Sequence, residues 1–428
     1  MTQTEQQNVP ALRFPGFEEA WEALKLGNFL EIKSASRVHK DEWRETGVPF
    51  FRSSDVVSAF KGNENKKAFI SNTLFEKLAK KSGKVAKGDL LVTGGGSIGI
   101  PYLIQSDAPL YFKDADLLWV RNSGEVEGFY LYTFFSGPIF RRYVQSITHI
   151  GTISHYTIEQ ARATPINLPT LPEQQKIAGF LGAVDERIAQ VTRKKTLLED
   201  YKKGCMQQLF SQSIRFKDDQ GNDFPDWEEK LLGDVFSWVN TNSLSRERLT
   251  YEGGTVQNIH YGDIHTKFSA NFRQGSENVP FVKDGTPSDF KDELFCKVGD
   301  VIIADASEDY ADIGKAIEVV ELAEIPLVAG LHTFIARPAS TDLEVGFSGY
   351  LLRCENMRRQ IVRIAQGISV LGVSKRNIEK LSLSLPHPDE QRKIADFLSA
   401  IDTKIDLLAK ELEQAKTFKK GLLQQMFV

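Results

Sequence analysis

Two stretches of the chain carry the same seven-residue pattern of hydrophobic positions. Apolar residues recur in alternating steps of four and three across 177–209 and again across 394–426. This spacing predicts two helices, each with one apolar stripe, as in a coiled coil. We expect the stripes to pair with each other in antiparallel orientation, and the alternative is that each helix packs on its own globular half. The helix-pairing residues are predicted to be Ile177, Leu181, Val184, Ile188, Val191, Leu198, Ile394, Leu398, Ile401, Ile405, Leu408 and Leu412.

Prolines mark where each helix begins. Pro169 and Pro172 stand at the first start, and Pro386 and Pro388 stand at the second. Each helix should hold about 38 residues, or about 57 Å at 1.5 Å per residue, whereas a small domain is only about 30 Å across. Much of each helix must therefore project beyond the domain that it joins. Three lysines that interrupt the stripes are expected to fix register or orientation: Lys195, Lys202 and Lys419.

Both helices belong to a longer internal repeat. LPTLPEQQKIAGFLGAVDERI from Leu168 matches LPHPDEQRKIADFLSAIDTKI from Leu385, and the two copies end in QQLF and QQMF. A repeat of this length indicates a duplicated domain with its helix rather than a solenoid unit. A protein with two equivalent halves tends to bind a target that also has two parts.

Two globular blocks precede the helices, and each is long enough for its own core. Short apolar, β-branched runs predict strands at 89–93, 117–120, 301–304 and 333–336, and helical patterns span 128–146 and 346–365. We therefore predict an α+β protein with two related mixed α/β domains and two long helices. The expected boundaries are 1–168 for the first domain, 169–212 for the first helix, 213–385 for the second domain and 386–428 for the second helix.

Weaker similarities relate the two blocks. Trp21 aligns with Trp227 and Gly27 with Gly233, while FRSSDV from Phe51 falls where IHYGDI lies in the second block. The stretches between these matches differ in length and character. Two related domains with different loops could recognise two different targets.

Charge is distributed unevenly. Residues 1–170 hold 20 Lys and Arg against 18 Asp and Glu, whereas residues 215–385 hold 19 against 27. An indiscriminate nucleic-acid binder would be strongly basic, so this balance argues against that class. It leaves open a protein that reads base edges from one face.

No membrane span, secretory signal or cysteine framework is evident in the sequence. The three cysteines are scattered, without the spacing of a metal site. We therefore expect a cytoplasmic protein with no membrane partner and no metal site.

The strongest chemical motif is the glycine-rich run from Gly94 to Gly99, which follows an apolar strand. Such a loop could hold phosphate on backbone amides, but it lacks the Gly-Lys-Ser/Thr of a Walker A motif and the spacing of a dinucleotide fingerprint. The equivalent stretch of the second block, ADASEDYADIG, is acidic and poor in glycine. His260 and His265 have no nearby ligands in a zinc-like arrangement. We therefore predict no catalytic residues.

The doubled Leu-Pro-x-x-x-Glu-Gln-x-Lys-Ile-Ala-x-Phe-Leu helix start resembles the specificity subunit of Type I restriction–modification systems. The Arg-Phe-Pro-x-Phe entry at Arg13 and the GDLLVTGGGSIGIP run at Gly88 are similar to that family too. The resemblance covers essentially the whole chain. It implies a non-catalytic subunit whose two target-recognition domains each read one half of a split sequence in double-stranded DNA.

The resemblance also implies the partners. Two methyltransferase subunits would dock on the helices, bring S-adenosylmethionine and methylate adenine at N6, and motor-nuclease subunits using ATP and Mg²⁺ could join them. This chain itself would bind no cofactor. Three other interpretations stay open: a specificity subunit of a stand-alone adenine methyltransferase, a nucleotide-modifying enzyme using the Gly94–Gly99 loop, and a structural dimerisation protein.

Readout of base edges needs polar side chains on loops that reach the major groove. The candidates in the first domain are Arg52, Ser53, Ser54, Thr93, Gly95, Ser97, Thr148 and His149. Those in the second domain are Asn258, His260, Tyr261, Lys267, Ser307 and Gln366. Phosphate contacts, which position the protein without reading sequence, are predicted for Arg141, Arg142, Lys375 and Arg376.

Overall fold

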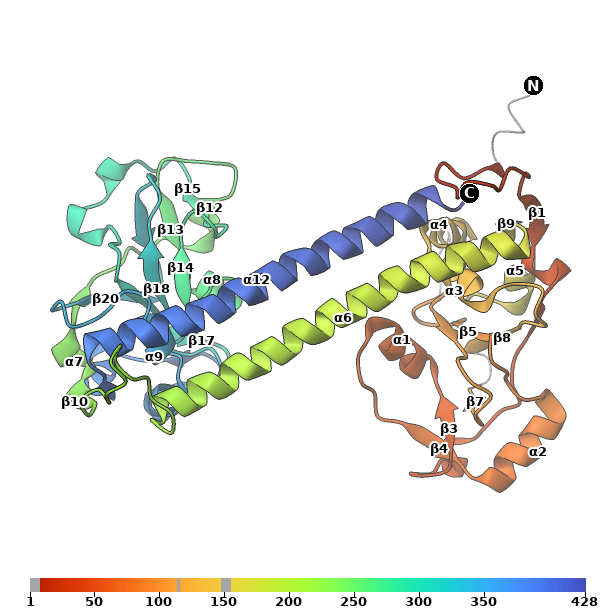
Figure 1. Cartoon of the computed structure of the whole chain (residues 1–428), viewed down its shortest axis with the longest axis horizontal. Helices are drawn as coiled ribbons and strands as arrows, with labels where there is room; N and C mark the ends of the chain where they lie inside the picture. The colour runs from red at the N-terminus through yellow and green to blue at the C-terminus, as the bar shows by residue number, and fades with distance from the viewer. Residues whose placement is uncertain (1–7, 114–115, 148–154) are drawn as a thin grey trace. The chain divides into compact units, whose positions relative to one another are not determined.

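The computed structural model describes residues 8–113, 116–147 and 155–428. Its internal contacts divide the chain into two compact units. The first unit runs to Thr192 and includes Lys410–Val428, and the second unit is Arg193–Ala409. Each unit therefore combines one globular domain with segments of both long helices (Figure 1).

The first unit is built on two small sheets and a strand pair. The larger sheet has the order β2-β8-β5-β6, the smaller has the order β4-β3-β7, and β1 pairs with β9. The strands are β1 (Glu22–Lys25), β2 (Glu31–Lys33), β3 (Val48–Phe51), β4 (Ala68–Ile70), β5 (Leu90–Thr93), β6 (Pro101–Leu103), β7 (Tyr111–Phe112), β8 (Leu117–Arg121) and β9 (Pro165–Leu168). The α-helices of its domain are α1 (Ser53–Lys61), α2 (Asn72–Ser82), α3 (Gly128–Ser136), α4 (Pro138–Ile147) and α5 (Ile158–Ala163).

The second unit has larger sheets. Their orders are β11-β20-β16-β18-β14 and β12-β15-β13-β19, with β10 paired to β22 and β17 to β21. The strands are β10 (Glu228–Leu231), β11 (Phe236–Val239), β12 (Leu249–Thr250), β13 (Gln257–Ile259), β14 (Asn271–Arg273), β15 (Phe281–Val282), β16 (Val301–Ala304), β17 (Ala306–Ser307), β18 (Ala316–Glu321), β19 (Leu327–Ala329), β20 (Thr333–Pro338), β21 (Leu371–Gly372) and β22 (Ser382–Leu385). Its short helices are α7 (Leu232–Val235), α8 (Tyr261–Thr266), α9 (Ser348–Leu351), α10 (Glu355–Ile364) and α11 (Lys375–Ile378).

A buried aspartate begins the central strand of each unit. Asp89 precedes β5 and accepts hydrogen bonds from the Ala86 amide and the Trp119 indole, both at 2.8 Å. Asp300 precedes β16, and its carboxylate accepts hydrogen bonds from the Arg337 guanidinium at 2.8 and 2.7 Å. The predicted mixed α+β architecture is confirmed, and the two domains share this framework.

Two helical predictions were wrong in detail. The pattern across 128–146 is two helices, because Gly137 is extended and Pro138 opens α4. A residue before proline is pushed out of the α region, which ends α3 there. The pattern across 346–365 is broken at the equivalent position of the repeat: Cys354, the counterpart of Gly137, is extended and is the N-cap residue of α10.

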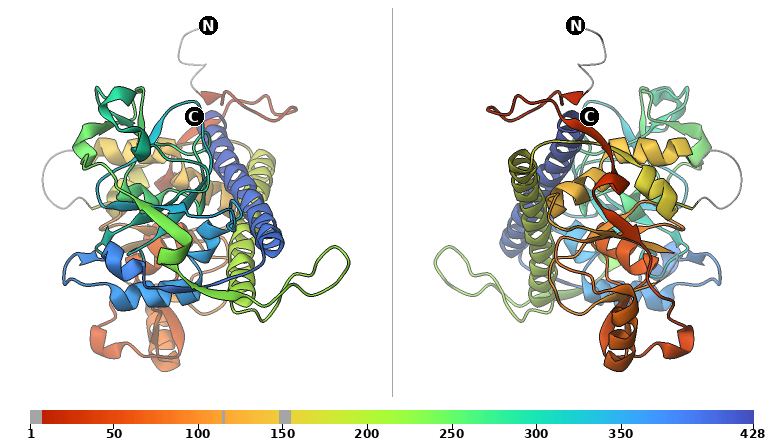
Figure 2. Two further views of the ribbon diagram at one scale, coloured as in Figure 1. Left: turned by 90° about the vertical axis from the view of Figure 1, so that its left-hand side faces the viewer. Right: turned by 90° about the vertical axis from the view of Figure 1, so that its right-hand side faces the viewer.

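The long helices are α6 (Leu171–Phe210) and α12 (Pro388–Gln425), of 40 and 38 residues. Within each unit their segments lie side by side and run in opposite directions (Figures 1 and 2). Lys419 reaches Asp185 at 2.5 Å in the first unit, and Lys202 reaches Asp402 at 2.5 Å in the second. The predicted antiparallel packing is therefore confirmed, and two of the interrupting lysines form ion pairs across it.

The residues predicted to pair the helices are all buried or half-buried. Some of them also pack into the globular domains: Ile177 and Leu181 belong to the core of the first unit, and Ile394, Leu398 and Ile401 to that of the second. The apolar stripes thus serve the domain cores as well as the helix pair.

The end of each long helix completes the core of a unit. In the first unit Phe427, just beyond α12, stacks on Tyr130 at a centroid distance of 5.2 Å and meets Trp21 edge-on. In the second unit Phe210 of α6 meets Trp227 at 6.4 Å and Phe347 at 5.9 Å. These contacts explain why QQLF and QQMF are repeated.

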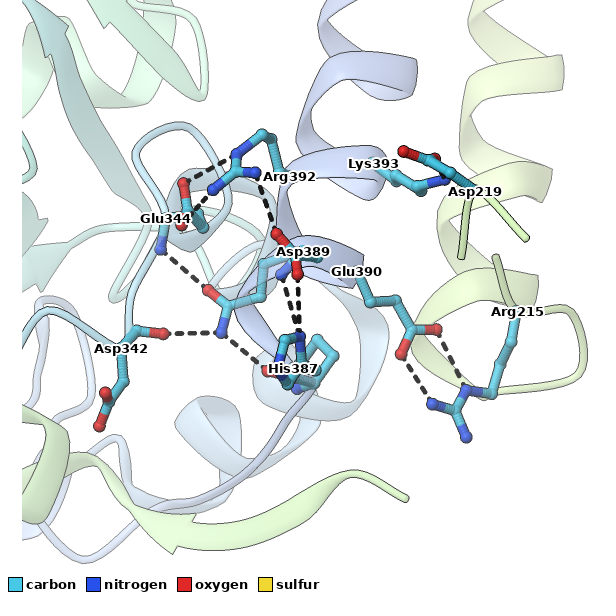
Figure 3. A network of polar contacts seen from close by, with 11 residues as sticks. Arg215, Asp219, Asp342, Glu344, His387, Asp389, Glu390, Arg392 and Lys393 are labelled. Atoms are coloured by element: carbon cyan, nitrogen blue, oxygen red, sulfur yellow. Dashed lines mark hydrogen bonds and ion pairs between the residues drawn. The ribbon is translucent and has the colours of Figure 1, made fainter. Parts of the chain in front are cut away.

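Buried Glu-Gln pairs join each domain to the helix that follows it. In the second unit Glu390 holds the Arg215 guanidinium at 3.1 and 2.7 Å (Figure 3). Its neighbour Gln391 donates to the Pro386 carbonyl at 2.8 Å and accepts from the Glu344 amide at 3.0 Å. Both side chains of the pair are fully buried.

The same junction recurs in the first unit. Glu173 accepts hydrogen bonds from Nε and Nη2 of Arg13, both at 2.8 Å, and Gln174 accepts from the Glu127 amide at 2.9 Å. These carboxylates are buried and fully used, so they orient the domain on its helix rather than present charge to a partner. The glutamates that mark the sequence repeat are therefore structural.

Candidate nucleic-acid interface

A polar hollow of about 360 Å³ opens on the second unit. It lies where β11, β20 and the segment after β16 come together, and its lining includes Trp238 and Phe334. Donor and acceptor groups of the kind that read base edges line its walls: Asn240, Thr241, Asn242, Ser243, Asp305, His332, Thr333 and Lys375.

His332 stands at the rim of this hollow with a left-handed backbone, φ 59°. Its Nδ1 lies 3.1 Å from the Asp305 carboxylate, and its ring packs edge-on to Tyr261 at 5.4 Å. Burial raises the pKa of Asp305, and the neighbouring His332 partly offsets the rise. A non-glycine residue held at positive φ costs of order 1–3 kcal/mol and is often found at functional sites.

Several residues predicted from the sequence gather beside the hollow. The Tyr261 ring lies tilted against His260 at 4.5 Å and edge-on to His332 at 5.4 Å. Lys375, at the start of α11, lies 5.9 Å above the Trp238 ring. Gln366 is joined to the same region, because Gln366 and Gly372 form a bridge next to the β17–β21 pair.

Other predicted residues in the second unit have internal partners. Asn258 is fully buried and accepts a hydrogen bond from Asn242 at 2.8 Å. Ser307 is buried in β17, where its hydroxyl accepts from the Asp309 amide. Lys267 is half-exposed and forms an ion pair with Asp263 at 2.8 Å. Arg376 is exposed on α11.

His260 caps α8 rather than pointing outward. Its Nδ1 accepts from the Gly262 amide at 3.1 Å. Burial lowers the pKa of His260, and the nearby Arg246 lowers it further, so the neutral ring is favoured. Within the part of the chain that the structure describes, no cluster of three His, Cys, Asp or Glu could hold a metal ion.

In the first unit the start of α1 meets the glycine loop. The Asp116 carbonyl accepts from the Ser53 hydroxyl at 3.2 Å and from the Gly94 amide at 2.8 Å. The Gly94 carbonyl in turn accepts from the Tyr156 amide at 2.7 Å. The structure thus brings the predicted Ser53 and the 94–99 loop together, with Ser54 and Ser97 exposed.

The glycine loop is closed on itself. The buried Thr93 hydroxyl donates to the Ser97 carbonyl and accepts from the Ile100 amide, and the Gly99 amide bonds the Thr93 carbonyl. Gly99 has φ 76°, and a Cβ there would lie 2.7 Å from the Phe140 ring. These amides are used within the fold, so the geometry does not favour a phosphate cradle. Gly95 is buried against His155.

Arg52 has side-chain partners within the fold, whereas the two arginines of α4 are exposed. Arg52 forms a two-pronged ion pair with Asp55 at 2.7 and 2.9 Å and packs on Trp43. Arg141 and Arg142 are exposed on α4. The predicted Thr148 and His149 lie outside the described residues, and all these individual DNA contacts stay predictions.

Comparison with known proteins decides the family. The model described as "Type I restriction modification DNA specificity domain" matches residues 18–200 and 225–417. The chain belongs to this family. Members recognise the DNA target for a Type I restriction–modification complex and are its non-catalytic specificity component, which agrees with the sequence prediction.

Individual relatives agree with the family assignment. The Type I restriction enzyme MjaVIII specificity subunit of Methanocaldococcus jannaschii is 24% identical over 430 residues, covering 97% of this chain and 93% of its own. The crystal structure of the Type I S subunit from M. genitalium has a TM-score of 0.59 at 16% identity, covering 98% of this chain and 99% of that one. A chain from a study of Type I complex assembly and conformational transition gives 0.56 at 17%, covering 96% and 98%. These structures show a shared fold.

With the family in place, the residues that sequence reasoning missed stand out. Asp305 and His332 are absent from the predicted set although they line the hollow of this specificity subunit. Ile368 was also missed: it is wholly exposed at the tip of the loop after Gln366. The apolar spacing carries no signal for any of the three. None of the helices in the described part of the chain combines the length and apolarity that a membrane crossing requires.

Proposed function

We propose that the two units read the two halves of a bipartite DNA target, one half each. In the second unit the hollow around His332 and Asp305 supplies the base-reading groups. In the first unit the exposed residues of the 94–99 loop and of the start of α1 do so.

The difference between the units carries this proposal. Their frameworks share equivalent contacts: Glu173 and Glu390 each hold an arginine, and Asp89 and Asp300 each accept a backbone amide three residues earlier. Their loops do not repeat: the closed glycine loop after β5 corresponds to an acidic loop after β16. A framework shared by both units, with different loops, suits two domains that each recognise a different DNA sequence.

Two methyltransferase subunits dock on the paired helices in this proposal. They bring S-adenosylmethionine and methylate adenine, and motor-nuclease subunits bring ATP and Mg²⁺. The duplication supports two equivalent partners, since each unit contains the same helix start and the same helix end. This chain holds no cofactor of its own.

The test changes one domain and leaves the other intact. His332→Asn keeps a residue that tolerates the left-handed backbone but removes the ring. Co-expressed with its methyltransferase, this variant should relax or change one half of the methylated motif and leave the other half and the gap unchanged. Single-molecule sequencing of modified adenines gives the motif directly.

His387→Asn is a matched control. His387 is as exposed as His332 and also has an aspartate beside its Nδ1, Asp389 at 3.5 Å, but it lies at the start of α12 (Figure 3). The control should keep the wild-type motif. Loss of specificity in both halves with His332→Asn, or an unchanged motif, would contradict the assignment of one half-site to this unit.

A further inference from the structure

A basic groove of about 350 Å³ lies in the first unit between its globular domain and the last part of α12. The domain side is formed by Phe60 at the end of α1, Tyr132 of α3 and Arg141 of α4. The α12 side is formed by Lys416, Lys419 and Lys420 among others. Residues far apart in the sequence thus place four cations around one hollow.

Most of this positive charge is not neutralised within the unit. Lys419 forms an ion pair with Asp185 at 2.5 Å, which fixes α12 against α6. Lys416, Lys420 and Arg141 are exposed, and the ion pairs found among the described residues include none of them. Lys416 and Lys420 are also four apart on one helix, where like charges repel. An anion in the groove would relieve that repulsion.

The groove leads to the candidate base-reading loop. Arg141 also lines a second hollow of about 200 Å³, whose other wall includes Ile98 and Gly99 of the glycine loop. A DNA backbone leaving that loop would therefore meet Arg141 first and then the lysines of α12.

The second unit does not repeat this arrangement. Arg358 is the counterpart of Arg141. It donates hydrogen bonds to the carbonyls of Ile313, Tyr310 and Ala311, so its guanidinium is bound within its own domain. The residue at the position of Lys416 is Glu199, which is paired with Lys195 at 2.6 Å. The groove is a property of the first unit alone.

We propose that this groove binds backbone phosphates of the DNA between the two half-sites, through Arg141, Lys416 and Lys420. The inference rests on the proposed function and extends it, because it makes α12 a DNA-contacting element as well as a spacer. Phosphate contacts add affinity without reading sequence. The groove therefore strengthens binding and leaves the recognised motif unchanged.

The test uses the complex with methyltransferase and a duplex carrying the motif found by methylation mapping. Each phosphate contact contributes about 0.9 to the slope of log affinity against log salt. The double variant Lys416→Gln, Lys420→Gln should lower that slope by about 2 and keep the motif. Uncharged methylphosphonate links in the gap should weaken wild-type binding more than the variant's binding, because the variant keeps only the Arg141 contact.

The matched control removes two exposed lysines from α6 in the second unit, as Lys194→Gln, Lys203→Gln. It should keep the wild-type slope. An unchanged slope in the Lys416, Lys420 variant overturns the inference, and so does loss of methyltransferase assembly, which would make the groove a protein-binding surface. Absence of specific binding by the wild-type complex would instead reject the proposed function, so the two failures are distinguishable.

Discussion

Glu318 shows how one buried acid can hold a loop in place. It lies on β18, is 1% exposed, and accepts the amides of Gly346 and Gly349 at 2.6 and 2.8 Å. Burial raises the pKa of this carboxyl to about 7, and the amide hydrogen bonds only partly oppose the rise. The residue therefore titrates near neutral pH.

The raised pKa gives a pH-dependent stability. The folded state holds the Glu318 proton up to about pH 7, whereas an unfolded glutamate loses it near 4.3, so stability falls as pH rises through this window. At 1.36 kcal/mol per unit the loss over the whole window is about 4 kcal/mol. Urea denaturation from pH 5 to 8 should show this slope in wild type and not in Glu318→Gln.

Glu321 on the same strand supplies the control for this measurement. It is exposed and pairs with Arg273 at 2.9 Å. Glu321→Gln should keep the wild-type pH slope. Equal slopes for wild type and Glu318→Gln would mean that the carboxyl does not titrate in this range.

Single residues were the least predictable level from the sequence. Tyr261 and Gln366 were predicted as polar residues on loops that could reach base edges, and Lys375 as a phosphate contact; all three lie near the hollow. Asp305 and His332 were missed, since their meeting depends on the antiparallel pairing of β16 with β20. Sequence alone does not give that pairing. Asn258 and Thr93 look like surface polar residues in the sequence, yet the fold buries both.

At the scale of elements, apolar spacing predicted the long helices well because they repeat one simple period over many turns. Which short strands pair with each other could not be predicted. Pairs such as β3 with β7 join residues about 60 positions apart in mixed sheets. Two of the three lysines that interrupt the stripes, Lys419 and Lys202, form ion pairs across the helices with Asp185 and Asp402, whereas Lys195 pairs within α6.

The Lys202–Asp402 pair should couple the two helices measurably. It is partly buried, at 2.5 and 2.7 Å, and Tyr350 donates to the same carboxylate at 2.7 Å. A double-mutant cycle with Lys202→Ala and Asp402→Ala should give a coupling of about 1–2 kcal/mol in denaturation experiments.

A pair within one helix provides the comparison for that cycle. Lys195 and Glu199 lie four apart on α6 at 2.6 Å and are more exposed. Their coupling should be at most about 0.5 kcal/mol. A Lys202–Asp402 coupling no larger than this would show that the pair does not hold the helices together.

At the scale of the whole molecule, the boundary between the units crosses both long helices. It falls between Thr192 and Arg193 in α6 and between Ala409 and Lys410 in α12. These two places are equivalent in the repeat. We propose that the helix segments joining the units set the gap between the half-sites.

Inserting one heptad at both boundaries tests this proposal. Seven residues keep the apolar stripes in phase and add about 10 Å. At 3.4 Å per base pair the gap should grow by up to about three base pairs, with both half-sites unchanged in the methylation map. New half-sites with the old gap would contradict the proposal, and a heptad in α6 alone should disrupt the pairing.

The packing of Phe427 against Tyr130 and Trp21 also bears on how the protein is made. Phe427 lies about 300 residues beyond Tyr130 in the chain, so it can pack on the core of the first unit only after the second domain has been synthesised. Phe210, by contrast, is synthesised before the second domain, whose Trp227 and Phe347 it contacts. The two repeated aromatic residues therefore become available at opposite times relative to the domains that they complete.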